Sequence, residues 1–89
     1  MLESQLQSKL IKLAEANGWY VLKLIKTNKN GIPDLYLYKG GRTVFVEVKR
    51  EGGKPRPLQE FRMKELREVG IEAIACDSVI KFENEILKK

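Results

Sequence analysis

The sequence predicts an α/β (α+β) domain with the element order helix, three strands, helix, strand, helix. Three observations lead to this order. Leucines recur at helical spacing near the N-terminus, three short runs of apolar and β-branched residues follow with turn residues between them, and a proline and a glycine bracket a second helix before a fourth apolar run. The 89 residues hold no repeat, linker or low-complexity segment, so one domain over residues 1–89 is expected.

The first helix is expected from Leu2 to Asn17. Leucines stand at positions 2, 6, 10 and 13, and Gly18 follows where a helix commonly ends. Residues 19–26 (WYVLKLIK) are rich in aromatic and β-branched side chains and predict the first strand. The turn residues of 27–33 end it.

Residues 34–39 and 42–49 predict two further strands, and Gly40 and Gly41 are typical of a two-residue hairpin turn between them. In that register the numbers of paired residues sum to 81, so Asp34 faces Glu47 on the same side of the sheet. Such a non-hydrogen-bonded pair has Cα atoms about 4.5 Å apart. Apolar side chains fill the opposite face: Leu35, Leu37, Val44, Val46 and Val48.

The second half of the chain predicts a helix, a strand and a short helix. Pro57 suits the first turn of a helix that runs to about Val69, with Gly70 as its stop. Residues 71–76 (IEAIAC) predict the fourth strand. The last helix is capped by Asp77 or Ser78 and carries Val79, Phe82, Ile86 and Leu87.

Two carboxylates opposed across a hairpin repel each other, and a divalent cation between them would offset the repulsion. Mg²⁺ typically binds one or two carboxylates and keeps waters and phosphate oxygens in its shell. Lys49 projects from the same face as Glu47, about 6.5 to 7 Å further along the strand. There it could orient an attacking water or stabilise charge that develops on a phosphate. The alternative is a surface hairpin whose acids pair with Lys23 or Lys49.

Glu3 and Gln59 are two further candidates for this site. Glu3 lies at the edge of the leucine stripe of the first helix and becomes a third acidic ligand if that helix covers the acid-bearing face. Otherwise it is an ordinary acid in a first helical turn, stabilised by the helix dipole. Gln59 opens the second helix, where its amide could hold a water or a phosphate. It could equally be a polar surface residue.

The charge balance favours a polyanionic partner. Lysine and arginine outnumber the acids 17 to 12, which gives a net charge of +5. The loop REGGKPRP offers phosphate contacts that position a nucleic-acid backbone, and other basic residues widen the surface. The loop contributes Arg50, Lys54 and Arg56, and the wider set contains Lys23, Lys26, Lys29 and Arg42. A solvated charged surface is the competing interpretation.

Residue types missing from the chain exclude several chemistries. With no histidine and one cysteine, Cys76, neither a Cys/His zinc site nor a His-dependent triad or dyad can form within one chain. Cys76 is expected in the core. No apolar leader and no run of about 20 apolar residues is present, so a soluble cytoplasmic protein is expected, without a membrane partner.

GIPD, then twelve residues, then EVK resembles the signature of the PD-(D/E)XK nucleases. The proline before Asp34, the later Gln59 and the LREVG that closes the second helix resemble more closely the VRR-NUC (virus-type replication-repair nuclease) group, including stand-alone members from phages and bacteria. The resemblance covers nearly the whole chain. It implies a restriction-endonuclease-like core, in which helices flank a mixed four-stranded sheet. The loop GGKPRPLQ departs from the family, where many members have a leucine-serine pair before the glutamine.

The resemblance also implies Mg²⁺- or Mn²⁺-dependent hydrolysis of DNA phosphodiesters. Asp34, Glu47 and the Val48 carbonyl would be metal ligands, Lys49 the catalytic lysine, and Gln59 the glutamine of the following motif. Glu3 would match the acid of the N-terminal helix that some members carry, as a further ligand. Similar proteins act as homodimers on branched DNA, including Holliday junctions, in a bacterial or phage-infected cell.

Three other functions stay open: a flap or general nuclease, a non-catalytic DNA-binding module on the same fold, and a structural subunit of a larger partner. A domain of 89 residues buries only about 60 to 65% of its unfolded surface, which independently favours dimerisation. Ile11 and the aromatic side of the hairpin are candidate dimer contacts.

Overall fold

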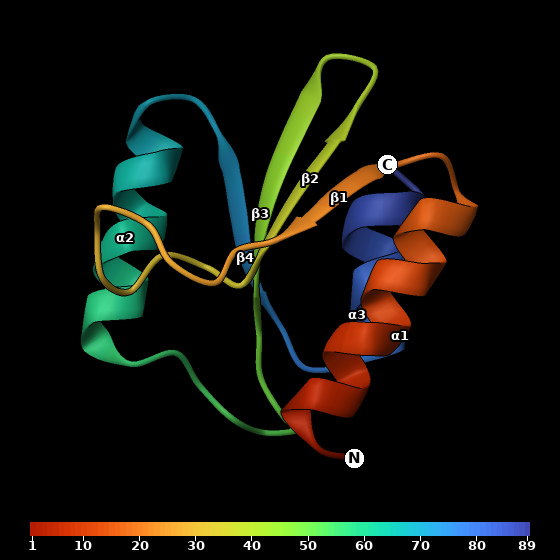
Figure 1. Ribbon diagram of the computed structural model, residues 1–89, viewed down its shortest axis with the longest axis horizontal. Helices are drawn as coiled ribbons and strands as arrows, with labels where there is room; N and C mark the ends of the chain where they lie inside the picture. Colours follow the sequence, from red (N-terminus) through yellow and green to blue (C-terminus); the bar gives the residue numbers. More distant parts are fainter.

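A computed structural model describes all of residues 1–89. Three layers make up the fold (Figure 1): α1 and α3 cover one face of a central sheet, and α2 lies against the other. The predicted order of elements is confirmed. Their bounds are α1 Glu3–Ala16, β1 Tyr20–Lys23, β2 Leu35–Lys39, β3 Arg42–Val48, α2 Pro57–Glu68, β4 Glu72–Cys76, α3 Val79–Phe82 and a π-helical continuation, η1, Glu83–Leu87. None of the helices combines the length and the apolar character needed to cross a membrane.

The sheet has the strand order β1-β2-β3-β4 and is mixed, as predicted. The first three strands form an antiparallel meander, and β4 pairs parallel to β3 after the crossover through α2. The predicted hairpin register is confirmed, since Leu35 pairs with Val46 and Lys39 with Arg42. Gly40 and Gly41 have φ values of 54° and 85°, the left-handed conformation that both central residues of a type I′ turn require.

The hydrophobic core lies between the sheet and the helices α1 and α3. Alternate residues of β2 and β3 supply its floor, in accordance with the two-residue period of a strand, and the leucine stripe of α1 covers it. Its members include Leu6, Leu10, Leu35, Leu37, Val44, Val46, Val48, Cys76, Phe82 and Ile86, each less than 5% exposed. Cys76 is thus the core residue that was expected, and the side chain is a free thiol.

The first strand is shorter than predicted. Residues 19–26 were expected to be extended, but β1 ends at Lys23, which pairs with Leu35, the first residue of β2. Beyond this point the neighbouring chain offers no further strand residue, and the Leu24 amide instead donates to the Asp34 carbonyl (2.8 Å). Residues 24–33 therefore form a loop, with Ile25 89% exposed.

Arg42 does not widen the basic surface, in contrast to the expectation. Its guanidinium donates to both Glu72 carboxylate oxygens (2.6 and 2.9 Å) and to the carbonyls of Ile86 (2.8 Å) and Glu85 (3.0 Å), and it lies 5.5 Å from the Trp19 ring centroid. One side chain thus ties the start of β3 to β4 and to the C-terminal helix. Ile11 is partly buried and packs against the edge of the core.

Replacing Arg42 tests this tie. We expect Arg42→Ala to lower the free energy of unfolding by about 2 kcal/mol, because the carbonyls at the C-terminal helix and Glu72 lose charged donors. Arg42→Lys should recover only part of the loss, since an ammonium cannot reproduce the planar fork. Urea unfolding measures both, with Lys88→Ala as the exposed control. Equal stability of Arg42→Ala and the control would show that the hydrogen bonds of Arg42 do not stabilise the fold.

Candidate metal centre and active site

Asp34 and Glu47 come together where the meander meets the loop that follows β1. Asp34 directly precedes β2, after the buried Pro33, and its Oδ2 accepts a hydrogen bond from the Val48 amide (2.8 Å). Glu47 is the sixth residue of β3 and is only 2% exposed. The strand pairing ends at Leu35 with Val46, so Asp34 and Glu47 are the next residues of the two chains, and Asp34 lies close enough for its charge to raise the pKa of Glu47. Glu47 alternates with the core residues Val46 and Val48, so its carboxylate lies on the sheet face away from the hydrophobic core.

The two oxygens of the Glu47 carboxylate have different surroundings. Oε2 accepts a hydrogen bond from the Gln59 amide nitrogen (3.1 Å) and lies 3.4 Å from the Lys49 ammonium. Oε1 is buried and has no hydrogen-bond partner. An unpaired buried carboxylate oxygen is costly, and it marks the position where a ligand or ion would complete the site.

Burial raises the pKa of Glu47 to about 7, and the nearby charge of Asp34 adds to the increase. The Lys49 ammonium acts in the opposite direction and lowers the pKa. Desolvation of the carboxylate outweighs the attraction of Lys49, so near neutral pH both the protonated and the charged form of Glu47 are populated. A divalent cation at this place would favour the charged form.

Gln59 is held in one orientation by the start of α2. Its Oε1 accepts a hydrogen bond from the Arg56 amide (2.8 Å), which is the cap of the helix, so its NH₂ group is turned toward Glu47. The sequence suggested that this amide could hold a water or a phosphate. The structure instead shows it bound directly to the buried acid.

The donor set fits a hard divalent cation. Across the parallel pair of β3 and β4, the Lys49 amide donates to the Cys76 carbonyl (2.9 Å). The neighbouring Val48 amide therefore points away from β4 and donates to Asp34. The Val48 carbonyl points to the same side as its amide, because the N–H and C=O groups of an extended residue have the same direction. Two carboxylates and one carbonyl, with space left for waters, match the oxygen ligands that Mg²⁺ prefers.

Glu3 is not brought into this cluster. Its side chain is exposed, and no group of three or more acidic, histidine or cysteine side chains lies close enough to hold a metal. Figure 1 places the first turn of α1 at the end of the sheet where the chain leaves β3. The helix thus begins near this end of the sheet, while the Glu3 carboxylate stays apart from Asp34 and Glu47.

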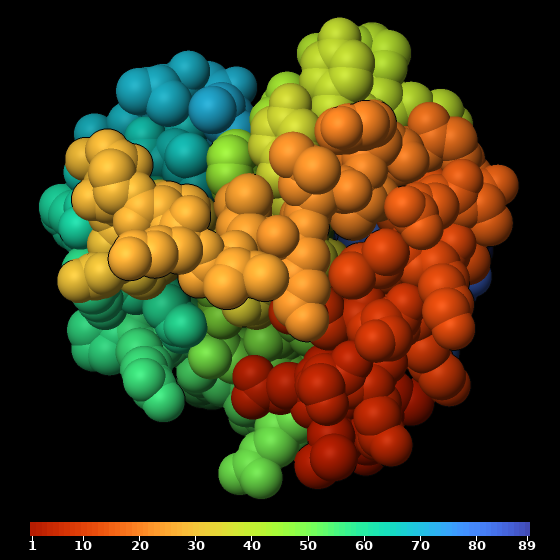
Figure 2. Space-filling model, in the orientation of Figure 1, coloured from red at the N-terminus to blue at the C-terminus, as the bar shows by residue number.

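The basic residues predicted to bind nucleic acid are exposed on two loops. Arg50, Lys54 and Arg56 lie between β3 and α2, and Lys29 lies on the loop between β1 and β2. In Figure 2 the second of these loops and the first turn of α1 border a hollow, within which atoms of the β3 end are visible. The loop after β3 is fixed by Gly52, whose amide donates to Asp77 (3.1 Å).

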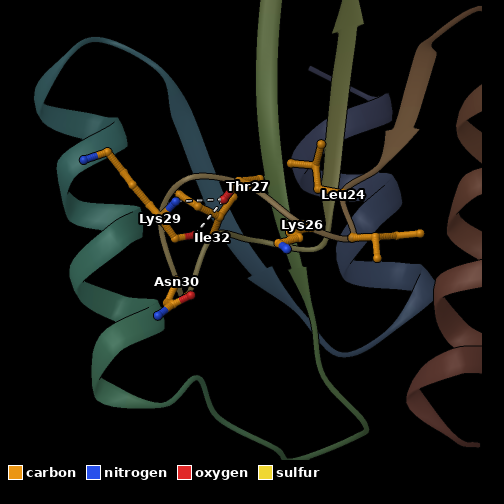
Figure 3. A pocket seen from close by; sticks show the side chains of 8 residues that line it. Leu24, Lys26, Thr27, Lys29, Asn30 and Ile32 are labelled. Atoms are coloured by element: carbon orange, nitrogen blue, oxygen red, sulfur yellow. Dashed lines mark hydrogen bonds between the residues drawn. The ribbon is translucent and has the colours of Figure 1, made fainter.

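The loop 24–33 has a fixed shape that the sequence did not reveal. Thr27 Oγ1 donates to the Lys29 carbonyl (2.6 Å) and accepts from the Lys29 amide (3.2 Å), as Figure 3 shows. Arg62 of α2 donates to the Asn30 carbonyl (2.8 Å). A Cβ added to Gly31 would come within 2.7 Å of the Leu58 side chain, so only glycine permits this contact with α2.

An antiparallel meander, a crossover helix and a parallel fourth strand, with Asp34 before β2 and Glu47-x-Lys49 ending β3, define the class of restriction-endonuclease-like PD-(D/E)XK folds. The model of one family within that class, the VRR-NUC domain, matches residues 2–80. The chain belongs to the VRR-NUC family of nuclease domains.

Relatives and solved structures agree with this membership. The chain is 30% identical over 77 residues to the "Putative nuclease p44" of Acyrthosiphon pisum secondary endosymbiont phage 1, a match that covers 85% of this chain and 83% of that protein. A solved VRR-NUC domain is 31% identical, with a TM-score of 0.83 over 94% of this chain and 96% of its own. A second VRR-NUC domain protein, 17% identical, has the same fold, with a TM-score of 0.83 over 99% and 87% of the two chains.

The raised pKa of Glu47 predicts how the metal-free protein responds to pH. The folded chain holds this proton to about pH 7 and the unfolded chain only to about 4.5, so the folded state binds more protons between these values. Stability must therefore fall as the pH rises through this window, by roughly 3 kcal/mol from this group. Glu47→Gln stays neutral at every pH. Between about pH 4.5 and pH 8 its free energy of unfolding should therefore increase, relative to that of the wild type, by this amount.

Urea unfolding in EDTA at several pH values measures this difference. Glu72→Gln is the matched control, because Arg42 lowers the pKa of Glu72 and the stability from that acid is lost as the pH falls. That loss lies below about pH 4.5, so between pH 4.5 and pH 8 Glu72→Gln should run parallel to the wild type while Glu47→Gln diverges from it. Parallel curves for wild type and Glu47→Gln would show that the Glu47 pKa is unperturbed.

Proposed function

We propose that this chain is a Mg²⁺- or Mn²⁺-dependent DNA endonuclease that hydrolyses phosphodiester bonds, with a preference for branched DNA such as Holliday junctions. Membership of a nuclease family supports the reaction class. The observation that carries the metal dependence is the Glu47 carboxylate, buried beside Asp34 with Oε1 lacking any partner. A purely structural hairpin has no need of such a costly group.

Asp34, Glu47 and the Val48 carbonyl would hold the ion. When bound, a divalent cation lowers the pKa of a coordinated water and neutralises charge on the phosphate. Glu3 remains a proposed additional ligand, which its exposed side chain could become only by turning toward the cluster. The chain's own contribution is to keep the two carboxylates close together in a place that water hydrates poorly, where their attraction for a cation is strong.

Lys49 and Gln59 act on the same carboxylate from two sides. The Lys49 ammonium is mostly buried and lies 3.4 Å from Glu47, so it supplies fixed positive charge to a phosphate approaching this face. It can also hold a water that attacks the phosphorus. Gln59 is a positioning residue, because it holds the Glu47 carboxylate while its other end is fixed by the cap of α2.

Selectivity for branched DNA and the homodimer belong together in this proposal. Each chain has one Asp34 and one Glu47, so symmetrical cutting of two strands needs two copies, which a two-fold dimer supplies. Of the two candidate contact regions, Ile11 packs inward, whereas Tyr20 and Tyr38 on the hairpin side are 62% and 43% exposed. Both regions stay candidates for the dimer contact.

Cleavage assays test the proposed reaction. Labelled four-way junction, flap, single-stranded and duplex DNA are incubated with EDTA, Mg²⁺ or Mn²⁺. We expect metal-dependent cleavage, fastest on the junction, and a loss of at least about 100-fold in Glu47→Gln, because the metal ligand is gone. Glu68→Gln, an exposed acid on α2, is the matched control.

DNA binding in EDTA separates the competing functions. Binding by the wild type without cleavage in any metal would replace the nuclease with a non-catalytic DNA-binding module. Fastest cleavage of the flap, or equal cleavage of all four substrates, would identify a flap or general nuclease. Wild-type rates in Glu47→Gln would contradict the metal site.

The exposed cations should set the salt dependence of binding. In EDTA, replacing Lys29, Arg50 and Lys54 together by alanine should weaken binding to all DNA forms similarly, and should lower the slope of log K against log salt by up to about 0.9 for each phosphate that the variant no longer neutralises. Fluorescence anisotropy at several salt concentrations measures this slope. Replacing three exposed lysines elsewhere, Lys9, Lys12 and Lys88, is the control. Equal slopes in the two triple variants would show that these loops do not contact the backbone.

A further inference from the structure

A largely apolar cavity of about 320 Å³ lies on the same sheet face as the acid pair. The sheet supplies Leu22, Tyr36 and Phe45, the loop 24–33 supplies Leu24 and Ile32, and α2 supplies Leu66. Tyr36 and Phe45 pack edge to face, with ring centroids 5.5 Å apart. The wall of the cavity is thus partly aromatic.

The cavity and the acid pair are neighbours in the fold. Tyr36 lies two residues beyond Asp34 along one strand, and Phe45 two residues before Glu47 along the other, a step of about 7 Å on the same face. The loop 24–33 lines the cavity and is closed at Asp34 by the hydrogen bond from Leu24 (2.8 Å). A linear polymer that contacts this loop can therefore reach both the cavity and the acid pair.

Two polar residues complete the lining of the cavity, and basic residues lie on the same loop. The polar residues are Thr27 and Asn28, and Asn28 is exposed, with no hydrogen bond of its side chain within the protein. Lys26 and Lys29 lie on the same loop, where they line the neighbouring pocket, and residues 17–33 contain no acid. The ligand that fits is apolar and flat in its body, carries hydrogen-bonding edges and is attached to negative charge.

We propose that this cavity binds an unpaired nucleobase of the DNA substrate, while the loop lysines hold the adjoining backbone. The inference rests on the proposed function, in that DNA is the ligand, and it names the feature of the DNA that is recognised. A base in a duplex is stacked and paired, so a flap or a single strand presents one without an unpairing cost, whereas a four-way junction presents one only when a base pair at its branch point opens. Two-fold contact of copies through the loop 24–33 would instead bring its lysines, Lys26 and Lys29, toward like charges.

Abasic substitution tests the cavity without any cleavage. Forked DNA is bound in EDTA, and the unpaired bases next to the branch are removed one at a time, leaving the phosphates intact. We expect one position at which loss of the base weakens binding about 5- to 150-fold, the range for a base on an aromatic surface. A change below twofold at every position would overturn the proposal.

Two variants link that effect to the cavity. Leu22→Ser removes an apolar wall residue that is 44% exposed, and Asn28→Trp blocks the mouth from an exposed loop position. Both should lose the sensitivity to the missing base, whereas Ile80→Ser, 70% exposed on α3, should keep it. Thermal unfolding verifies that each variant folds.

Three outcomes contradict the assignment. The first is an unchanged abasic penalty in both cavity variants. The second is conversion of a dimer to a monomer by Leu22→Ser in light scattering, which would assign the cavity to a second copy of the chain. The third is no DNA binding at all in EDTA. Failure of the nuclease proposal is recognised separately, as binding without metal-dependent cleavage.

Discussion

The antiparallel pairing of β2 with β3 decides where the functional side chains of this protein lie. The turn at Gly40 and Gly41 allows only two residues between the strands, and both adopt the left-handed conformation. A slip of one residue would turn Glu47 into the hydrophobic core and Val48 out of it. The same constraint therefore holds the core together and keeps the acids on the opposite face.

Burial of Glu47 is the main electrostatic cost of the fold. The carboxylate is covered on a face that also carries Tyr36 and Phe45, and Asp34 adds a like charge. Lys49 and Gln59 compensate one oxygen and leave the other unpaired. A buried acid with one unpaired oxygen destabilises the fold by itself, but the same oxygen can bind a cation. The metal-free protein is therefore less stable than it would be with a fully paired residue at this position.

Elements far apart in the sequence complete the site. Gln59 comes from α2, where it also closes the helix cap, and Arg62 from the same helix fixes the loop that ends at Asp34. Moving α2 would thus displace a Glu47 partner and the loop together. The face that carries the acid pair is built as one unit, in which the sheet and its loop supply the acids and α2 holds the groups that surround them.

Local signals in the sequence were sufficient for much of this arrangement. Leucine spacing predicted α1, and Pro57 and Gly70 bracketed α2. The two-glycine turn predicted the register in which Leu35 pairs with Val46, directly beside Asp34 and Glu47. Contacts between distant residues were not predictable in this way. The early end of β1, the bond from Arg62 to Asn30 and the use of Arg42 within the fold all depend on partners that only the folded chain brings near.

The Glu3 prediction shows the same limit. A helical angle indicates which side of α1 a residue faces, but it cannot tell how far the carboxylate remains from the sheet. Gln59 shows the opposite case, in which a weak positional signal led to a residue that touches the buried acid, although the contact itself was not foreseen.

Titration of the protein with Mn²⁺, followed by electron paramagnetic resonance of the free ion, tests the central claim most directly. It requires neither DNA nor a correct guess of the substrate. If the buried acid pair is a metal centre, the wild type binds Mn²⁺ near neutral pH, Glu47→Gln and Asp34→Asn each weaken binding at least about tenfold, and Glu68→Gln does not. No Mn²⁺ binding by the wild type, or equal binding by all four proteins, would contradict the account.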